Sequence, residues 1–453
     1  MNDSLPRLRS RLGDRVVLPG APGYDEVRRI WNAMHDRRPG LIARCLSAKD
    51  VAAALDYATS VDKKVTVRGG GHNVAGAALA DDAILIDLSL MREVTVDLDA
   101  GLAHAQGGCL LRDVDVATTA HGLACPAGVV SHTGLGGLAL GGGYGWLARK
   151  WGLTCDHIEA AEVVLADGSI VETDAETHPD LFWALRGGGG GFGVVTRFTL
   201  RLRPVGPVHL RTGVYSLDNA REALAAYRDF AEKQPADLHT VGALKQVSAQ
   251  DWIPAPMHGK PALFLTAGWF GAPADGSVAT KPLFDATTPA VVRTQLMSYA
   301  ELQSLADHSE PHGNRYYTKS CYVIDLTDQP IEEFLGAARD IRSSRSCIDF
   351  EYLRGAIDDV PDEDSAFPGR AAPYIYTASA QWTDIRRDPE NVEWSRRSVE
   401  RLGPWWYGGG AYVNYVQDEP EAKFVDVFGE SRYRRLAAVK QRYDPHNVLR
   451  HRP

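Results

Sequence analysis

Four clusters of glycines within the first 206 residues constrain this chain more than any other feature. A glycine run is entropically costly to order, so it is expected where the backbone must take positive φ or approach another group closely. Successive backbone N–H groups in such loops can form concave nests that bind anions such as a pyrophosphate. One cluster alone could be a plain turn, but four predict an extended binding cradle. The clusters are Gly69 to Gly71; Gly134, Gly136 and Gly137; Gly141 to Gly143 with Gly145; and Gly187 to Gly191 with Gly193.

The second cluster also matches a dinucleotide fingerprint, because "GLGGLA" at 134–139 fits the pattern GxGxxA and Asp156 follows at about the spacing of a ribose ligand. A Rossmann fingerprint must follow a strand and open a helix. Here Gly141 to Gly143 would interrupt that helix within its second turn, at up to ~1 kcal/mol per glycine. We therefore do not expect a nicotinamide-binding Rossmann domain.

Length and charge narrow the class of protein further. The chain has 453 residues, enough for roughly two to four domains. Its net charge of -9 comes without a block of like charges, so no nucleic-acid footprint is indicated and a small-molecule partner is favoured. The six cysteines are scattered singly, without metal or disulfide spacing. No leader or membrane span of ~18 apolar residues is apparent, which favours a cytoplasmic protein that binds neither membrane nor metal.

Residues 1–206 alternate strand and helix signals closely. Ser47, with Asp50 three residues later, is expected to cap a helix that leads into a strand at 64–69. A buried strand is expected at 83–88, and Asp167-Gly168 suits the tight turn of a hairpin.

Beyond residue 207 the elements lengthen and predict a sheet backed by helices. Strands are expected at 261–271, 350–357 and 372–382, and helices at 218–234, 330–343 and 388–403. A last helix carries apolar residues from Tyr433 to Tyr443 and should stop at Asp444-Pro445.

Four segments in order resemble one family: "VRGGGHNVAG" (67–76), "SHTGLGGLALGGGYGWLARKWGLTCDHI" (131–158), "DLFWALRGGGGGFGVVTRF" (180–198) and "AYVNY" with "RYDPHNV" (411–415 and 442–448). They are similar to the FAD-linked oxidases of the vanillyl-alcohol-oxidase superfamily, within it to the berberine-bridge-enzyme and 6-hydroxy-D-nicotine-oxidase group. The resemblance implies an α+β, two-domain fold. Its FAD-binding domain would comprise 1–206 and a returning segment, 411–453, with a substrate domain of antiparallel sheet covered by helices inserted at 207–410.

The resemblance also implies how FAD is attached. In that family the histidine that closes the glycine loop is joined through its ring to the flavin 8α-methyl, and the corresponding residue here is His72. A non-covalent loop histidine, as in some relatives, is the alternative. Other relatives add a thioether from a cysteine, but that position is Val130 here, and Cys125 lies five residues upstream. We therefore expect a single bond through His72 and a structural role for Cys125.

Further cofactor-binding residues follow from the same resemblance. The residues expected around the pyrophosphate are Arg68, Gly69, Gly70, Gly71 and Asn73. The glycines expected to let the rest of the cofactor approach closely are Gly134, Gly137, Gly141, Gly142, Gly143 and Gly145. We expect Val195 near the adenosine, and Tyr412 and Asn414 at the isoalloxazine. His132 is either a flavin neighbour or a loop histidine. Thr133 occupies a position that influences oxygen access in relatives.

The general base is the least determined residue. Relatives place an acid or amide on a substrate-domain strand, where this chain has Ile375 and Thr377, and neither takes a proton near neutral pH. Alternation puts Tyr376 on the opposite face of that strand. Tyr412 is therefore the predicted base, with a buried core phenol as the alternative reading and with Tyr376 or Tyr415 as substitutes. A tyrosine pKa near 10 would have to be lowered for this role.

Three functions remain open at this stage. The first is an oxidase that removes a hydride from a C–H bond next to O or N of a small, possibly aromatic, polycyclic or glycosidic substrate, with O2 as acceptor and H2O2 as product. The second is a flavin dehydrogenase with another acceptor, and the third a non-catalytic binding or resistance protein on the same fold. A role in secondary metabolism and a monomer or homodimer are expected with the first.

Overall fold

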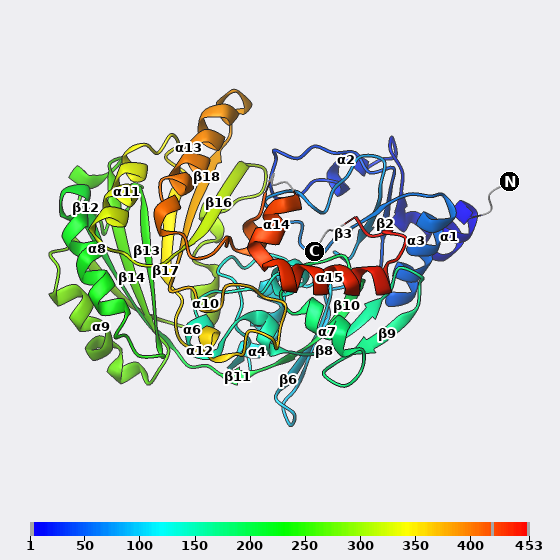
Figure 1. Ribbon diagram of the computed structural model, residues 1–453, viewed down its shortest axis with the longest axis horizontal. Coiled ribbons are helices and arrows are strands. Elements are labelled where there is room, and N and C mark those ends of the chain that lie inside the picture. Colours follow the sequence, from blue (N-terminus) through cyan, green and yellow to red (C-terminus); the bar gives the residue numbers. More distant parts are fainter. Residues whose placement is uncertain (1–3, 418–420, 451–453) are drawn as a thin grey trace.

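Sheets of two kinds lie at opposite ends of the computed structural model, which describes residues 4–417 and 421–450 (Figure 1). Two small sheets come from residues before 202, and a large sheet comes from residues 208–382. The predicted division at 206 and 410 stays a prediction, and parts of its outer segments lie outside the described residues.

The first small sheet has the order β1-β2-β4-β3, with parallel pairing of β2 with β4 and of β3 with β4. Its strands are β1 (Val16–Val17), β2 (Leu41–Arg44), β4 (Ile84–Asp87) and β3 (Val65–Arg68). The helix α3 (Ala48–Ser60) precedes β3, and the Ser47 side chain accepts a hydrogen bond from the Asp50 N–H as the capping pattern predicts. The strand β3 ends at the first glycine cluster, which it therefore holds at a sheet edge.

The second small sheet is antiparallel, in the order β5-β6-β10-β8-β9. It consists of β5 (Val94–Asp97), β6 (Leu102–Gln106), β10 (Val194–Arg201), β8 (Ile158–Val164) and β9 (Ile170–Thr173). The predicted hairpin joins β8 to β9, and Gly168 in its turn has φ +83°. The helices α4 (Leu111–Thr119), α5 (Leu135–Leu140) and α7 (Pro179–Leu185) surround this sheet, and a small pair, β7 (Leu123–Ala124) with β11 (Arg203–Pro204), lies beside it.

The large sheet has seven antiparallel strands in the order β15-β12-β14-β13-β17-β18-β16. The strands are β12 (Val208–Ser216), β13 (Leu238–Gln246), β14 (Pro261–Trp269), β15 (Val291–Met297), β16 (Arg315–Val323), β17 (Cys347–Tyr352) and β18 (Tyr374–Trp382). One face packs on α8 (Leu217–Ala231), α9 (Gly276–Asp285), α11 (Asp328–Arg339) and α13 (Asp388–Glu400), on the left of Figure 1. The other face is turned toward the small sheets. The predicted strand at 350–357 is partly wrong, because β17 ends at Tyr352 and the chain then turns into α12 (Ala356–Asp359).

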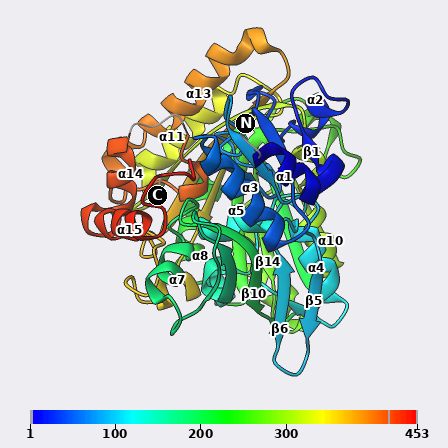
Figure 2. The same ribbon diagram turned by 90° about the vertical axis from the view of Figure 1, so that its right-hand side faces the viewer.

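The chain returns to its N-terminal half after the large sheet. The helix α14 (Glu421–Phe428) leads into α15 (Glu430–Tyr443), which lies beside α7 (Figures 1 and 2). The Arg442 guanidinium and the Tyr443 hydroxyl both bind the Asp180 carboxylate at 2.8 Å. Beyond α15, Leu449 forms a parallel bridge with Val65, so the end of the described chain closes against β3.

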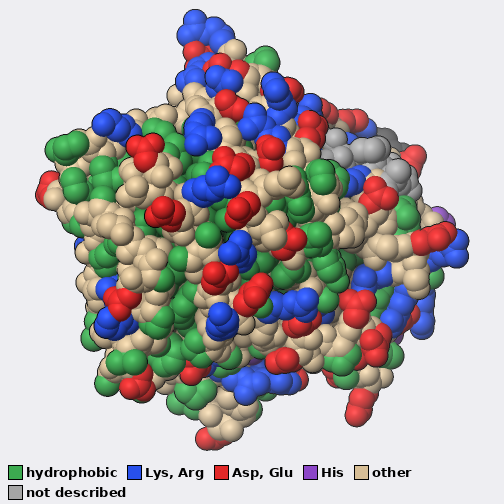
Figure 3. Space-filling model, turned by 60° about the vertical axis from the view of Figure 1, so that its left-hand side comes forward, with side chains coloured by type: hydrophobic (Ala, Val, Ile, Leu, Met, Phe, Trp, Pro, Cys, Tyr) green, Lys and Arg blue, Asp and Glu red, His purple; other side chains and the backbone are tan. Residues whose placement is uncertain are grey.

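Basic and acidic side chains are interspersed over the face drawn in Figure 3, which looks toward the large sheet and its helices. Among the described residues, helices long and apolar enough to cross a membrane are absent.

Candidate active site

A cavity of about 970 Å³ lies between the glycine loops and the open face of the large sheet. Its N-terminal wall is formed by Gly69 to Gly71, His72, Asn73, Val130, Thr133, Gly134, Gly137, Gly188 to Gly191 and Val195. Its opposite wall includes Thr212, Lys245, Phe264, Asp349, Glu351, Thr377, Ser379 and Gln381. Tyr412 to Tyr415 lie where the two walls meet. This volume is at the upper end of the range for ligand sites and suits a long cofactor together with a substrate.

The first two glycine clusters touch through their backbones. A Cβ on Gly70 would lie 2.4 Å from the Gly134 nitrogen, and a Cβ on Gly134 would lie 2.2 Å from the Gly70 nitrogen. Such distances exclude any side chain at either position. The glycines therefore bring two loops, 64 residues apart in the chain, into one continuous wall.

His72 lies on this wall in an aromatic stack. Its ring is stacked on Trp31 at 4.1 Å between centroids, and Trp31 is stacked on Tyr316 at 3.6 Å. Its Nε2 atom is buried and has no hydrogen-bond partner among the described residues. Burial, with smaller contributions from His132 and His312, lowers the pKa of His72 to about 3. The imidazole is therefore neutral at physiological pH, with a nitrogen lone pair available for bonding.

His132 packs against His72 with 5.0 Å between ring centroids, and His312 lies 5.0 Å from His132 and 6.4 Å from His72. Burial also lowers the pKa values of His132 and His312. These rings flank His72, and among the described residues no group of three or more His, Cys, Asp or Glu side chains could hold a metal ion.

Tyr412 and Asn414 are fixed to each other and to the third glycine cluster. The Tyr412 hydroxyl accepts hydrogen bonds from the Gly143 N–H at 3.0 Å and the Asn414 Nδ2–H at 2.9 Å, and Asn414 also donates to the Leu138 carbonyl. Burial raises the pKa of Tyr412 to about 12, although both donors favour the phenolate. The lowered pKa that a base at neutral pH needs is therefore not present in the protein alone.

The two substitute bases differ in position. Tyr415 lies on the cavity wall, with its ring edge-on to Tyr412 at 5.0 Å. Tyr376 is wrong as a candidate, because its fully buried side chain packs on Phe334 of α11 at 4.5 Å, on the helix side of the sheet. The alternation expected for β18 is confirmed, since Thr377 lines the cavity while Tyr374 and Tyr376 face the helices.

The structure also corrects the role expected for Arg68 at the pyrophosphate. Its guanidinium is directed at the buried Asp87 carboxylate, with 2.6 Å between Nη2 and Oδ2, and at the carbonyl of Val27. An isolated Arg68 would be costly to bury, so the ion pair on the neighbouring strand β4 determines its direction.

Gly141, Gly142, Gly143 and Gly145 differ from the other predicted glycines, because they pack against protein and do not line the cavity. Cβ atoms there would meet Asn414, Phe367, Thr154 and the Ala127 carbonyl. Their contribution to the site is to hold the turn under Tyr412 and Asn414, and α5 ends at Gly141 as the glycine run predicts. Asp156, the possible ribose ligand of a Rossmann domain, is instead paired with Arg370.

Carboxylates on β17 were missed by the sequence prediction. Asp349 and Glu351 line the cavity, and Glu351 lies 2.7 Å from the His239 imidazole. Burial raises the pKa of Asp349, and it raises the pKa of Glu310, also on the wall, to about 8. The alternation of polar Asp349 and Glu351 with apolar Ile348 and Phe350 is the signal that could have found them.

The surroundings of Cys125 and Val130 agree with the structural role expected for Cys125. Cys125 is buried in the core of the N-terminal half, where burial raises its pKa. Val130 lines the cavity at the position of the second flavin link in some relatives.

A match to known proteins defines the class of this fold and site: residues 39–174 match the family model described as "FAD binding domain", and residues 411–453 match "Berberine and berberine like". The FAD-linked oxidoreductase pgmH of Aspergillus terreus is 35% identical over 98% of this chain and 94% of its own. The solved structure of 6-hydroxy-D-nicotine oxidase from Arthrobacter nicotinovorans has a TM-score of 0.84 at 26% identity, over 97% of this chain and 96% of that one. Physcomitrella patens BBE-like 1 has a TM-score of 0.87 at 24% identity, over 98% and 97%.

The chain therefore belongs to the FAD-linked oxidoreductases of the berberine-bridge-enzyme-like group, in the vanillyl-alcohol-oxidase superfamily. The predicted family, fold class and cofactor, FAD, are confirmed. The residues present fit FAD, because the cavity wall at Gly70 and Gly134, two loops too close together to admit side chains, leads to a neutral imidazole at His72 whose Nε2 atom has no hydrogen-bond partner among the described residues.

Proposed function

We propose that this protein is an oxidase that removes a hydride from a C–H bond next to O or N of a small organic molecule and a proton from that O–H or N–H group. FAD, when bound, supplies the two-electron acceptor. Molecular oxygen then takes both electrons and two protons, which gives hydrogen peroxide. The observation that carries this proposal is the single cavity that joins His72 and the glycine loops to the polar face of β17 and β18.

His72 is proposed as the one covalent attachment point. A neutral ring nitrogen is the form that can bond to an electrophilic carbon, and the low pKa keeps His72 in that form. The stack with Trp31 and the flanking His132 fix the direction of the ring. With Val130 at the other position, a second bond through cysteine is not part of the proposal.

Tyr412 is proposed to take the substrate proton. Two N–H donors converge on its oxygen, from Gly143 and Asn414, and would stabilise a phenolate in the way an oxyanion hole stabilises developing negative charge. The pKa must fall from about 12 for this role. Asp349 and Glu351, on the same cavity wall, are the competing acceptors.

The substrate side of the cavity combines aromatic rings with polar groups. Lys245 lies 4.9 Å above the Phe264 ring and Arg293 lies 5.6 Å above the Trp252 ring, and all four line the cavity. Asp349, Thr377 and Gln381 add hydrogen-bonding groups to the same cavity wall. This lining suits a flat aromatic or a polyhydroxylated substrate that stacks on a ring and hydrogen-bonds at its edge.

The test is a substrate screen read by anaerobic bleaching of the flavin. The panel contains 6-hydroxynicotine and gluco-, xylo- and chito-oligosaccharides, the compounds after which proteins of the same fold are named. Peroxide released in air at the rate of turnover supports the oxidase. If a substrate bleaches the flavin but turnover requires an artificial dye as electron acceptor, the protein is a dehydrogenase. Purified protein without flavin indicates a binding protein.

A further inference from the structure

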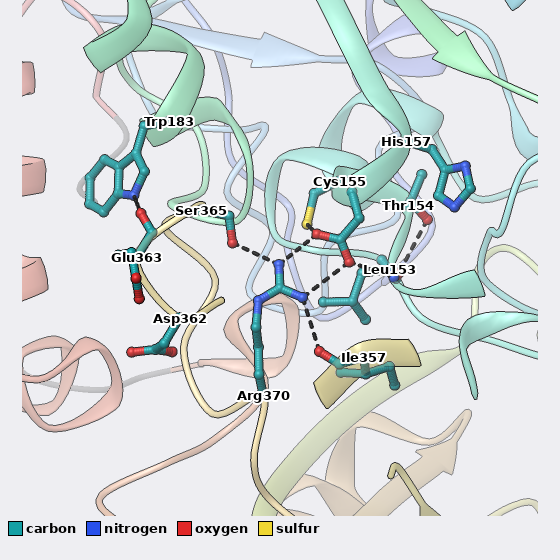
Figure 4. A network of polar contacts seen from close by, with 12 residues as sticks. Leu153, Thr154, Cys155, His157, Trp183, Ile357, Asp362, Glu363, Ser365 and Arg370 are labelled. Atoms are coloured by element: carbon teal, nitrogen blue, oxygen red, sulfur yellow. Dashed lines mark hydrogen bonds and ion pairs between the residues drawn. The ribbon is translucent and has the colours of Figure 1, made fainter. Parts of the chain in front are cut away.

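A buried ion pair joins the segment before β18 to the N-terminal half of the molecule (Figure 4). The Arg370 guanidinium donates to both Asp156 carboxylate oxygens, at 2.5 and 3.1 Å, and the two side chains are 3% and 7% exposed. Arg370 donates further to the Ser365 hydroxyl at 2.7 Å and the Ile357 carbonyl at 3.2 Å. Such a bidentate pair is directional as well as attractive.

Asp156 in turn fixes the tight turn at 153–157. Its Oδ2 accepts the Leu153 N–H at 2.9 Å, so Arg370 and the turn share one carboxylate. The next two backbone N–H groups of this turn point at the third glycine cluster: the Thr154 N–H donates to the Gly143 carbonyl and the Cys155 N–H to the Gly142 carbonyl, both at 2.8 Å.

The glycine turn passes this restraint on to the cavity. Gly142 and Gly143 have φ of +107° and +79°, a conformation that the hydrogen bonds from Thr154 and Cys155 hold. The Gly143 N–H then donates to the Tyr412 hydroxyl. The same segment that carries Arg370 closes over the turn, because the Phe367 ring lies where a Gly142 side chain would be.

We propose that Arg370 and Asp156 are a positioning pair that sets the orientation of Tyr412 through the Gly142–Gly143 turn. The importance of Tyr412 for catalysis rests on the proposed function, but the effect of the ion pair on the glycine turn does not depend on it. Loss of the pair should loosen the 153–157 turn, free the glycine turn and release the Gly143 N–H from Tyr412, while both halves of the molecule stay folded.

The test is hydrogen exchange measured by mass spectrometry on the flavin-loaded protein, which needs no substrate. In Arg370→Met and Asp156→Asn, the rate of hydrogen exchange in a peptide covering 138–147 is expected to rise about ten-fold. This is the change expected when the loss of one hydrogen bond lets a backbone segment open more often. Exchange in α8 (217–231) is expected to stay unchanged. Arg370→Lys, which keeps the charge opposite Asp156, should restore part of the protection.

Arg315→Met is the matched control, because Arg315 also forms a two-pronged pair, with Asp388 of α13, at 2.6 Å for its Nε. It should leave the 138–147 peptide unchanged. Ser365→Ala, which removes one neutral hydrogen bond to Arg370, is the milder variant should Arg370→Met fail to fold, and it should raise exchange in the same peptide.

Tyr412→Phe supplies the decisive comparison. Because it removes the acceptor of the Gly143 N–H, adding Arg370→Met to it should raise exchange at 138–147 by less than in the wild-type background. Fully additive effects, unchanged exchange at 138–147, or an equal rise in α8 would each overturn the proposal. If the coupling holds but Tyr412→Phe reduces its flavin at the wild-type rate, the proposed role of Tyr412 fails and the positioning pair stands.

Discussion

The Tyr412 hydroxyl accepts a hydrogen bond from the backbone N–H of Gly143, 269 residues earlier in the chain. The bond joins the segment that returns after the large sheet to a turn of the N-terminal half. It places a phenol oxygen on the cavity wall with two N–H donors directed at it. Removing the oxygen therefore separates its chemistry from the packing of its ring.

Tyr412→Phe is expected to keep the flavin but to slow anaerobic flavin reduction by roughly 10²-fold, the usual scale for a positioned base. Stopped-flow bleaching with a substrate from the screen measures this rate. Tyr376→Phe, on the helix side of the large sheet and away from the cavity, is the control and should reduce at the wild-type rate. Should Tyr412→Phe match the wild type while Asp349→Asn or Glu351→Gln is slow, the proton acceptor is a carboxylate.

Gly137→Ala tests whether the cofactor follows the glycine wall. Gly137 lies in α5 and on the cavity wall, and apart from its chain neighbours and the backbone of α5 no described atom lies within 4 Å of the Cβ that alanine would add. Alanine in a helix is favoured over glycine by up to ~1 kcal/mol, so the fold should not suffer. We expect normal thermal stability of the flavin-free protein but less flavin per chain.

Gly206→Ala is the control for that variant, because Gly206 also has open space around it and lies away from the cavity wall. Flavin content equal to that of the wild type in Gly137→Ala would contradict a cofactor path along α5.

Asp115 predicts a pH dependence of stability. It lies in α4, is 3% exposed, and has a pKa that burial raises from 3.8 to about 7, opposed by a hydrogen bond from Gln303. Between these values the folded state holds a proton that the unfolded state has released, so stability falls as pH rises toward 7. Relative to Asp115→Asn, the wild type should lose roughly 2–3 kcal/mol between pH 5 and pH 8.

Thermal unfolding of both proteins at the two pH values measures this difference. Asp115→Asn should raise Tm more at pH 8 than at pH 5. An equal change in Tm at both values would mean that Asp115 is ionised in the folded state.

Local patterns in the sequence predicted much of this structure. Ser47 caps α3, Asp167-Gly168 turns the hairpin, and the two faces of β18 alternate as expected. Each depends on neighbours within a few residues, where sterics and hydrogen bonding decide the conformation.

Long-range pairing was the part that could not be predicted. Arg68 turns to Asp87 because β4 lies beside β3, and Arg370 reaches Asp156 across 214 residues. The carboxylates on β17 belong to a different case: their alternation was visible, but only the position of β17 between β13 and β18 places their face on the cavity.

Covalent binding of FAD through His72 alone is tested by the intact mass of the denatured protein. The wild type is expected to carry the added mass of one FAD and to stay yellow after acid precipitation. His72→Ala should show the polypeptide mass alone, while His132→Ala should keep the flavin. A wild-type mass without FAD, or an FAD adduct that survives in His72→Ala, would show that His72 is not the covalent attachment point.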